Sequence, residues 1–386
     1  MTKYVKILFA IITVAIACNP NARHKQSTVV SPENTIVIRE SVVEPIVKMS
    51  NILKPVGFIE LELNDNSFIG YADKTVVLDE HIIIASYKQR AVFVFNRVGK
   101  HVATYQQHGG GPGEIIELID FCYDAVNREI FILDVAKIVV LGFDGSHLRD
   151  IPLDIGGLRL SYSEKLEHFY VVIGRGDPAV IGKVDKKGNL VSSYFEKGKI
   201  NAITGRKTLF KNNGEVLAMF YLSDTVYVAE KDGINIHRYI DFDRKITTNQ
   251  YTRLENDYSI ANISALLPQV MSNINFYAEF DDGSSTGIFH YQGKRHGFVY
   301  DKDQAVYRVF DMSEAENDIT FEARMANFET LSPEGYLVNV LNAEELTEES
   351  VALLNGRSHA PQALKELVVG KNSQNSNPII MLLKWI

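Results

Sequence analysis

The segment YQQHGGGPGEIIELIDFCYDAVNREIFILDVAKIVVLGFDGSHLRDIP, residues 105–152, contains the pattern that predicts the fold. A glycine-rich loop precedes short apolar runs, which are separated by the turn-forming pairs Asn127-Arg128 and Asp144-Gly145. Each run is too short for a helix and is rich in Ile, Val, Phe and Leu, so we predict antiparallel strands joined by tight turns. Four such strands form one small sheet with two faces to cover and two edges to protect.

Turns of this kind recur between strong strands. The first four lie about 45 residues apart, the period of a four-stranded propeller blade. They occupy residues 96–100, 143–146, 185–189 and 231–233. A fifth turn, at residues 300–303, comes later than this period requires, which predicts an insertion within residues 243–270 that is helical near Ile260–Val270.

The repeats predict an all-β protein, a six-bladed β-propeller of four-stranded antiparallel blades with short helical insertions near residues 255–270 and 343–368. The last blade, formed by residues 325–331, 336–340 and 379–385, is one strand short. Phe58–Leu63 precedes the first complete blade and has no partner of its own. We therefore predict that it pairs with Ile379–Trp385 and closes the ring, since closure removes both edges.

The first and second strands of the five complete blades are also predicted. In order along the chain they are residues 75–78 and 82–85, 116–123 and 129–133, 158–162 and 169–173, 208–210 and 216–219, and 274–280 and 287–290.

The N-terminus has the pattern of an export signal. Lys3 and Lys6 precede an apolar run that ends in Ala15-Ile16-Ala17-Cys18, which fits a bacterial lipobox except that Ala15 stands where Leu is more usual. The alternative is an ordinary signal peptide with an incidental cysteine. If lipidated, Cys18 would attach the protein to the outer membrane within the cell envelope. We expect residues 1–17 to be a lipoprotein signal peptide, 18–55 a polar tether and 56–386 the propeller.

Composition restricts the partners. A net charge of −8 and a pI near 5.7 argue against nucleic acid as a ligand. With Cys18 acylated, Cys122 has no cysteine to pair with, and its apolar strand predicts a buried structural thiol. We expect a monomer whose only membrane contact is the N-terminal lipid anchor.

Several short motifs suggest chemistry but have simpler explanations. Residues 109–114, GGGPGE, lack the Lys-Ser/Thr of a phosphate loop and are interpreted as a turn between blades. Arg175-Gly176-Asp177 matches an adhesion tripeptide, yet Gly-Asp-Pro is ordinary turn chemistry. His290 and His296 flank a predicted hairpin without an evident third metal ligand. The sequence has no HExxH, GxSxG or EF-hand pattern, so the cofactor is unknown; Ca²⁺ is compatible with the fold but no local motif indicates it.

The motif order resembles a known family. FIELELNDNSFIG, HGGGPGE after the first blade, EIFILD in the second and a terminal NPIIMLLKW are similar to the six-bladed β-propeller lipoproteins of gut-dwelling Gram-negative bacteria. The resemblance covers residues 58–386 and implies the fold and the lipid anchor. The family is largely uncharacterised and its blades look like those of NHL-type propellers, so the resemblance implies no reaction.

Chain geometry indicates where a ligand would bind. Loops between the second and third strands of each blade lie on the same face as the crossings between blades, and they are expected to form one rim of the central channel. The candidate ligand-binding residues on this rim are His108, Glu114, Arg175, Asp177, Lys294 and Arg295. No catalytic residue is predicted. The favoured function is a non-catalytic envelope module that binds a glycan, peptide or protein; the alternative is a metal-dependent hydrolase or lyase of the six-bladed type.

Overall fold

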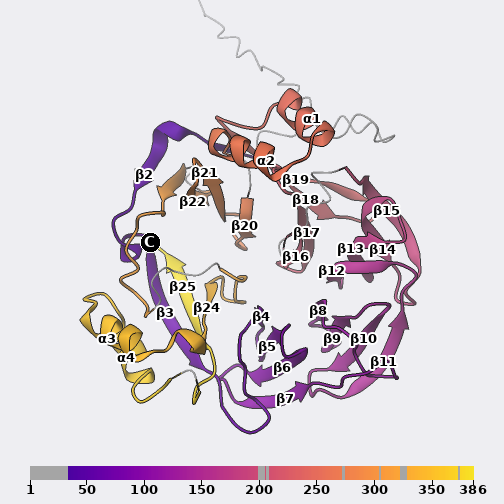
Figure 1. Ribbon diagram of the computed structural model, residues 1–386, viewed down its shortest axis with the longest axis horizontal. Helices are drawn as coiled ribbons and strands as arrows, with labels where there is room; N and C mark the ends of the chain where they lie inside the picture. Colours follow the sequence, from indigo (N-terminus) through magenta and orange to yellow (C-terminus); the bar gives the residue numbers. More distant parts are fainter. Residues whose placement is uncertain are drawn as a thin grey trace, which may run out of the picture.

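Six small sheets form a ring around a central axis (Figure 1). The computed structural model describes residues 34–198, 205, 208–271, 274–303, 306–321, 328–372 and 374–386. In each of blades 1 to 5 the chain passes from the innermost strand to an outer one through antiparallel neighbours. The predicted six-bladed β-propeller is therefore confirmed.

Each of the first five blades is a run of four consecutive strands. Blade 1 contains β4 (Lys74–Val77), β5 (His81–Ser86), β6 (Ala91–Asn96) and β7 (His101–Tyr105). Blade 2 contains β8 (Asp120–Asp124), β9 (Glu129–Leu133), β10 (Lys137–Gly142) and β11 (His147–Pro152). Blade 3 contains β12 (Gly156–Ser163), β13 (His168–Arg175), β14 (Ala179–Val184) and β15 (Leu190–Glu196). Blade 4 contains β16 (Leu209–Asn212), β17 (Glu215–Met219), β18 (Thr225–Ala229) and β19 (Ile234–Phe242). Blade 5 contains β20 (Ile274–Glu279), β21 (Ser285–Tyr291), β22 (Lys294–Asp301) and β23 (Val306–Asp311).

The last blade closes the ring as predicted. Its sheet has the order β24 (Leu337–Leu341), β25 (Ile379–Trp385) and β3 (Leu53–Glu60), and β25 pairs antiparallel with β3. The expected inner strand, residues 325–331, lies partly outside the described residues. Its described end runs along β24, where the Glu329 amide donates to the Val338 carbonyl at 2.8 Å. Blade 6 is thus completed by a strand from the beginning of the chain.

The segment before β3 differs from the expected polar tether. β1 (Thr35–Ile38) pairs parallel with β19, the outermost strand of blade 4, and β2 (Val43–Pro45) pairs parallel with β23, the outermost strand of blade 5. Figure 1 shows β2 and β3 in succession along the outside of the ring. Short 3₁₀ turns, η2 (Glu40–Val42) and η3 (Met49–Asn51), connect these strands. Residues 34–55 therefore pack against three blades, because alternating apolar residues such as buried Ile36 and Ile38 supply a fifth strand.

Apolar clusters between neighbouring blades form the core. One cluster joins blades 1 and 2, the next joins blades 2 and 3, and the series continues around the ring. The closing cluster brings Val338 and Ile380 of blade 6 against Ile82 and Phe93 of blade 1. Stability is therefore distributed over six similar interfaces, as expected for a repeat protein.

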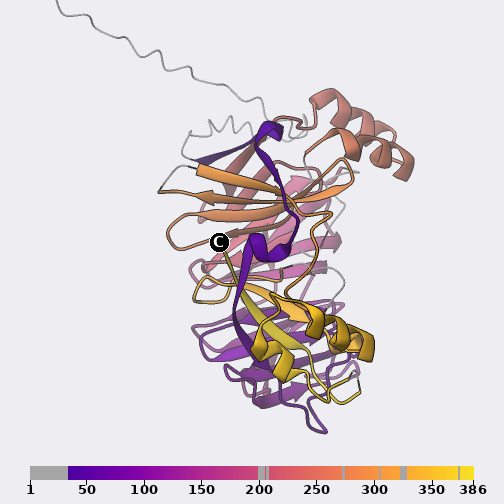
Figure 2. The same ribbon diagram turned by 90° about the vertical axis from the view of Figure 1, so that its left-hand side faces the viewer.

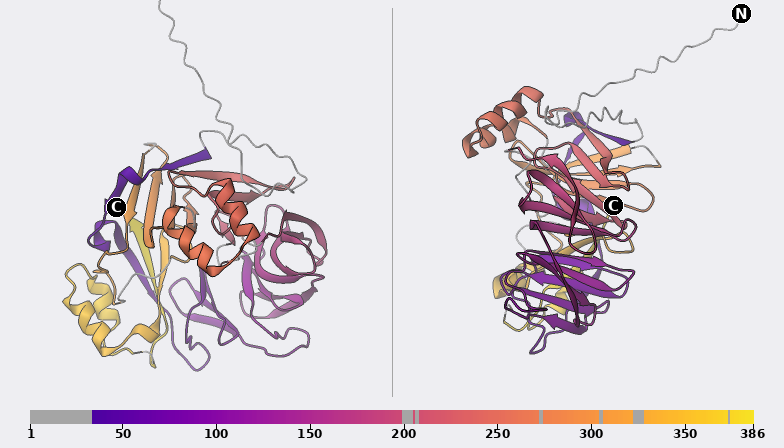
Figure 3. Two further views of the ribbon diagram at one scale, coloured as in Figure 1. Left: turned by 45° about the horizontal axis from the view of Figure 1, so that its top comes forward. Right: turned by 90° about the vertical axis from the view of Figure 1, so that its right-hand side faces the viewer.

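Two helical insertions stand on the same face of the disc (Figures 2 and 3). α1 (Thr248–Asn256), α2 (Ile260–Leu266) and η4 (Leu267–Gln269) lie in the crossing from blade 4 to blade 5. η5 (Ala343–Glu345), α3 (Glu348–Gly356) and α4 (Gln362–Leu367) lie between β24 and β25. The first connection leads into the inner strand β20, and the second joins the second and third strands of blade 6. Both kinds of connection lie on the crossing face, so the helices mark this face.

Among the described residues, no helix is both long and apolar enough to cross a bilayer.

Candidate ligand-binding channel

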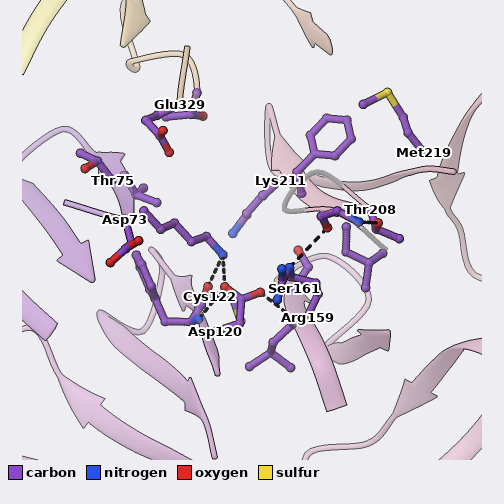
Figure 4. Close-up of a pocket in the computed structure, with 18 of the residues that line it drawn as sticks. Asp73, Thr75, Asp120, Cys122, Arg159, Ser161, Thr208, Lys211, Met219 and Glu329 are labelled. Atoms are coloured by element: carbon purple, nitrogen blue, oxygen red, sulfur yellow. Dashed lines mark hydrogen bonds and ion pairs between the residues drawn. The ribbon is translucent and has the colours of Figure 1, made fainter. Parts of the chain in front are cut away.

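The inner strands enclose a cavity of about 490 Å³ (Figure 4). Its wall includes residues of β4, β8, β12, β16 and β20, together with residues 328–330 of blade 6, so all six blades contribute. Many of these residues lie at the first positions of the inner strands, which start at the crossing face. The cavity therefore opens toward the face that carries the helical insertions.

A buried carboxylate joins three blades at the cavity wall. Asp120 is the first residue of β8 and is 1% exposed. Its Oδ1 lies 2.7 Å from the Lys74 Nζ of blade 1, and its Oδ2 accepts a hydrogen bond from the Leu160 amide of blade 3 at 2.9 Å. Lys74 also donates to the Phe121 carbonyl at 2.6 Å. The positive charge of Lys74 is thus compensated by the buried Asp120 carboxylate.

A second lysine is compensated in the same way. Lys211, in β16, forms an ion pair with Glu164, and its ammonium lies 4.2 Å from the centre of the Tyr123 ring. Glu164 also accepts a hydrogen bond from the Ala125 amide at 3.1 Å. This pair connects blades 2, 3 and 4 and leaves Lys211 almost wholly buried.

Arg159 of β12 differs from the two lysines. Its side chain is partly buried and lines the cavity beside Ser161 and Thr208 (Figure 4). Its Nη1 donates to the Leu158 carbonyl at 2.5 Å and its Nε to the Gly205 carbonyl at 3.3 Å. Both acceptors are neutral.

The wall across the channel from Arg159 carries acidic groups. Asp73, immediately before β4, accepts a hydrogen bond from the Tyr87 amide at 2.8 Å. Glu329 of blade 6 lies on the same side, away from Arg159 (Figure 4). The cavity wall also includes the partly exposed aromatic residues Tyr87 and Tyr221. The channel thus combines aromatic surface with charges of both signs.

The six rim residues predicted from sequence lie outside this cavity wall. His108 lies on the crossing from blade 1 to blade 2, where its Nε2 contacts the Arg90 carbonyl at 3.2 Å. That contact joins the crossing to the loop between the second and third strands, so the two features share one face as predicted. Arg175 ends β13 and is exposed, and the Asp177 carboxylate accepts the Ala179 amide at 2.8 Å within the turn. Ligand binding by these rim residues stays a prediction.

Lys294 and Arg295 were predicted in the corresponding loop of blade 5, but they are the first two residues of β22 and pair with Tyr291 and His290 of β21. Lys294 forms an ion pair of 2.8 Å with Asp311 and is exposed. Arg295 is partly buried, and this burial lowers the pKa of its guanidinium. Arg295 is therefore less exposed to solvent than a rim residue, which is what the sequence suggested it to be.

The glycine-rich segment is a structural turn, as predicted. The Glu114 carboxylate accepts a hydrogen bond from the Gly111 amide at 2.9 Å, and Gly113 has a φ of +73°. A Cβ added at Gly109 would collide with the same carboxylate. Glycine is required here because the chain folds tightly around Glu114 as it passes between blades.

The cysteine and histidine candidates have structural environments. Cys122 is a buried free thiol, and burial raises its pKa, which suppresses the reactive thiolate. His296 pairs with Phe289 across the blade and stacks on its ring, so the adjacent His290 faces the opposite side of the sheet. The two histidines therefore cannot bind one metal ion. Among the described residues, no group of three or more His, Cys, Asp or Glu side chains has the arrangement of a metal site.

Sequence reasoning missed the charged residues of the channel wall. Lys74, Asp120, Arg159 and Lys211 lie within or next to the predicted inner strands. An inner strand is the most enclosed strand of its blade, so a charge within it requires a buried partner or a polar channel. The signal in the sequence that could have revealed the channel wall was the presence of charged residues in the first strand of successive repeats.

The fold and the cavity define this protein as a six-bladed β-propeller with an accessible central channel. A family model described as a domain of unknown function, DUF4934, matches residues 33–384, and the chain belongs to this family.

A solved structure shares the fold at low sequence identity. It is a Bacteroides fragilis protein whose name marks it as expected to be exported; it is 18% identical, with a TM-score of 0.74 over 91% of this chain and 99% of that one. A member of the DUF4221 family from Bacteroides vulgatus is 11% identical, with a TM-score of 0.49 over 87% of this chain and 99% of that one. The search of curated proteins found none similar to this chain. The first structure supports the propeller fold, and its name fits an exported protein.

Proposed function

We propose that this protein is a lipid-anchored module of the cell envelope that binds a ligand in its channel and acts by binding rather than by catalysis. The observation that carries the proposal is the cavity of about 490 Å³, to which every blade contributes. Binding sites for small molecules have volumes of roughly 300–1,000 Å³ and combine apolar surface with a few placed polar groups. The channel has both properties, and its rigid strands hold the polar groups in place.

The size of the cavity favours a small ligand or the end of a chain over a broad protein surface. A short oligosaccharide or peptide would reach the cavity from the crossing face. Attachment to the membrane through Cys18 would keep the module where such ligands pass.

Binding can be tested on a soluble form that begins at Asn34. Oligosaccharides and short peptides are screened by the shift in melting temperature, since a ligand at 100 times its Kd stabilises a protein by about 2.7 kcal/mol. Asn275 is an exposed residue of the cavity wall near the start of β20, so Asn275→Trp should obstruct entry and abolish the shift. Asn355→Trp, on exposed α3, is the matched control and should bind as the wild type does.

Two results would count against the proposal. If Asn275→Trp binds every ligand as well as Asn355→Trp does, the cavity is not the site. If the purified protein converts a bound ligand into product, the non-catalytic role is wrong.

Anchoring has its own test. Cys18→Ser should leave the propeller folded but move it from the membrane fraction to the soluble fraction, because the acyl chains would supply the attachment. Metabolic labelling with a fatty-acid analogue measures lipidation directly. Wild-type protein that carries no label would contradict the anchor.

A further inference from the structure

We infer that the channel ligand carries a carboxylate group and that Arg159 binds it. This inference rests on the proposed function and names the chemical class of the ligand. Its basis is the distribution of charge in the cavity wall, where Arg159 differs from Lys74 and Lys211.

The two lysines are already neutralised by the protein. Lys74 is paired with Asp120, and Lys211 is paired with Glu164. Both carboxylates also accept backbone amides from a neighbouring blade, which fixes them in the wall. A ligand anion would have to compete with these carboxylates, so the lysines are structural connections between blades.

Arg159 has the opposite arrangement. A guanidinium has five N–H donors, and the described residues accept from only two of its nitrogens, Nε and Nη1. Both acceptors are backbone carbonyls, so no carboxylate of the described chain compensates the charge. A partly buried charge without a counterion is unfavourable, and a guanidinium matches the two oxygens of a carboxylate in geometry. A bound carboxylate would therefore complete the site.

The surroundings limit what else the ligand contains. Ser161 and Thr208 line the cavity next to Arg159 and offer neutral polar groups. Asp73 and Glu329 add carboxylates to the wall across the channel. The aromatic residues Tyr87 and Tyr221 in the cavity wall suit a sugar ring or an aromatic side chain. A uronic acid or a short peptide combines such a ring with a carboxylate.

The test uses pairs of probes that differ only in the carboxylate. Glucuronic acid is compared with its methyl ester, and glycyl-tyrosine with glycyl-tyrosine amide, by calorimetry on the form that begins at Asn34. We expect one acid to bind at least tenfold more tightly than its neutral counterpart, which corresponds to about 1.4 kcal/mol. The pair that shows the difference identifies the source as sugar or peptide.

Variants assign the effect to the residue. Arg159→Gln should weaken binding of the preferred acid at least tenfold without changing the affinity for its neutral counterpart, whereas Arg159→Lys should retain part of the preference. Arg253→Gln, at an exposed position on α1, is the matched control and should bind as the wild type does. The melting temperature of each unliganded variant shows that it is folded.

The outcomes separate the two proposals. Neutral probes that bind as tightly as the acids, and that Asn275→Trp excludes, would overturn the carboxylate inference and leave the binding channel intact. Acids that bind equally well to Arg159→Gln would also overturn the inference. If the acids fail to bind while ligands from the wider screen bind and are excluded by Asn275→Trp, only the carboxylate inference is wrong. If nothing enters the cavity, both proposals are wrong.

Discussion

Glu114 organises the glycine-rich turn between blades 1 and 2 through one side chain. Its carboxylate lies within the ring of glycines and accepts the Gly111 amide, and Gly113 in the same turn donates to Asp150 of blade 2 at 3.1 Å. The turn therefore depends on a local cap and on a contact with the next blade. The residue types of this segment predicted a turn, whereas the contact with Asp150 became evident only in three dimensions.

Removal of the Glu114 carboxylate should destabilise the protein. Glu114→Ala leaves a partly buried amide unpaired, and we expect the free energy of unfolding to fall by roughly 1–3 kcal/mol. Glu117→Ala is the control, because Glu117 is exposed in the same crossing. Urea denaturation measures both variants; equal stability of the two would contradict a capping role.

At the scale of the strand and blade, buried ion pairs connect neighbouring sheets. Asp120 binds groups from blades 1 and 3, and Glu279 of blade 5 forms ion pairs with His237 and Arg238 of blade 4. Burial opposes ionisation of Glu279, but hydrogen bonds from these two partners outweigh it and lower the pKa of the carboxyl. These contacts hold the blades in register where apolar packing alone would allow them to slide.

Loss of one partner of the Asp120 pair should be costly. Asp120→Ala leaves Lys74 without its counterion and two backbone amides unpaired, so stability should fall by about 3–5 kcal/mol. The double variant Lys74→Met, Asp120→Leu removes both charges and should lose less than the sum of the single changes. Asp79→Ala, at an exposed turn, is the control. Additive losses in denaturant titrations would show that the two residues do not interact.

Asp150 predicts a dependence of stability on pH. Burial acts to raise the pKa of this carboxyl, but hydrogen bonds from Lys137, the Gly113 amide and His147 outweigh it and lower the pKa below its ordinary value of 3.8. Because the folded state has the lower pKa, the stabilisation is present above pH 3.8 and is lost as the pH falls through the folded-state value.

Comparison of the wild type with Asp150→Asn tests this dependence. The variant should be less stable at pH 7, and the difference in the free energy of unfolding should shrink as the pH falls below 3.8. Denaturant titrations at a series of pH values give that difference. A difference that stays constant down to pH 3 would rule out ionised Asp150 as its cause.

At the scale of the whole molecule, the terminal strands differ in what they contribute to the ring. β25 lies between β24 and β3, so it is the central described strand of blade 6. β1 and β2 instead add to the outer edges of blades 4 and 5, which are complete without them.

Truncation should therefore have unequal effects. Deletion of residues 375–386 removes β25, breaks the ring and should abolish the folded monomer. A form that begins at Met49 loses β1 and β2 but keeps β3, so it should fold with a lower melting temperature than the form that begins at Asn34. Loss of buried Ile36 and Ile38 alone accounts for about 1.5–3 kcal/mol each. Chromatography and calorimetry compare the three forms; a stable monomer without β25 would contradict closure by this strand.

The sequence by itself determined the blade architecture and the closing strand pair. Short apolar strands, turns such as Phe143-Asp144-Gly145-Ser146 and the recurrence of these turns are local properties of the sequence. A repeat protein needs little beyond contacts between neighbouring repeats. The pairing of β3 with β25 followed because Phe58–Leu63 was an apolar strand without a partner and the last blade was one strand short.

Only the tertiary structure decided where the channel charges lie and how the N-terminal segment packs. Lys74, Asp120 and Arg159 are far apart in the chain, and one cavity wall forms only when the first three blades assemble. Thr35–Ile38 and Val43–Pro45 are short strands in polar surroundings, and their pairing depends on edges that exist only in the finished ring. The physical reason is the same in both cases. Contacts between segments that are distant in the chain produce no repeating pattern in the sequence.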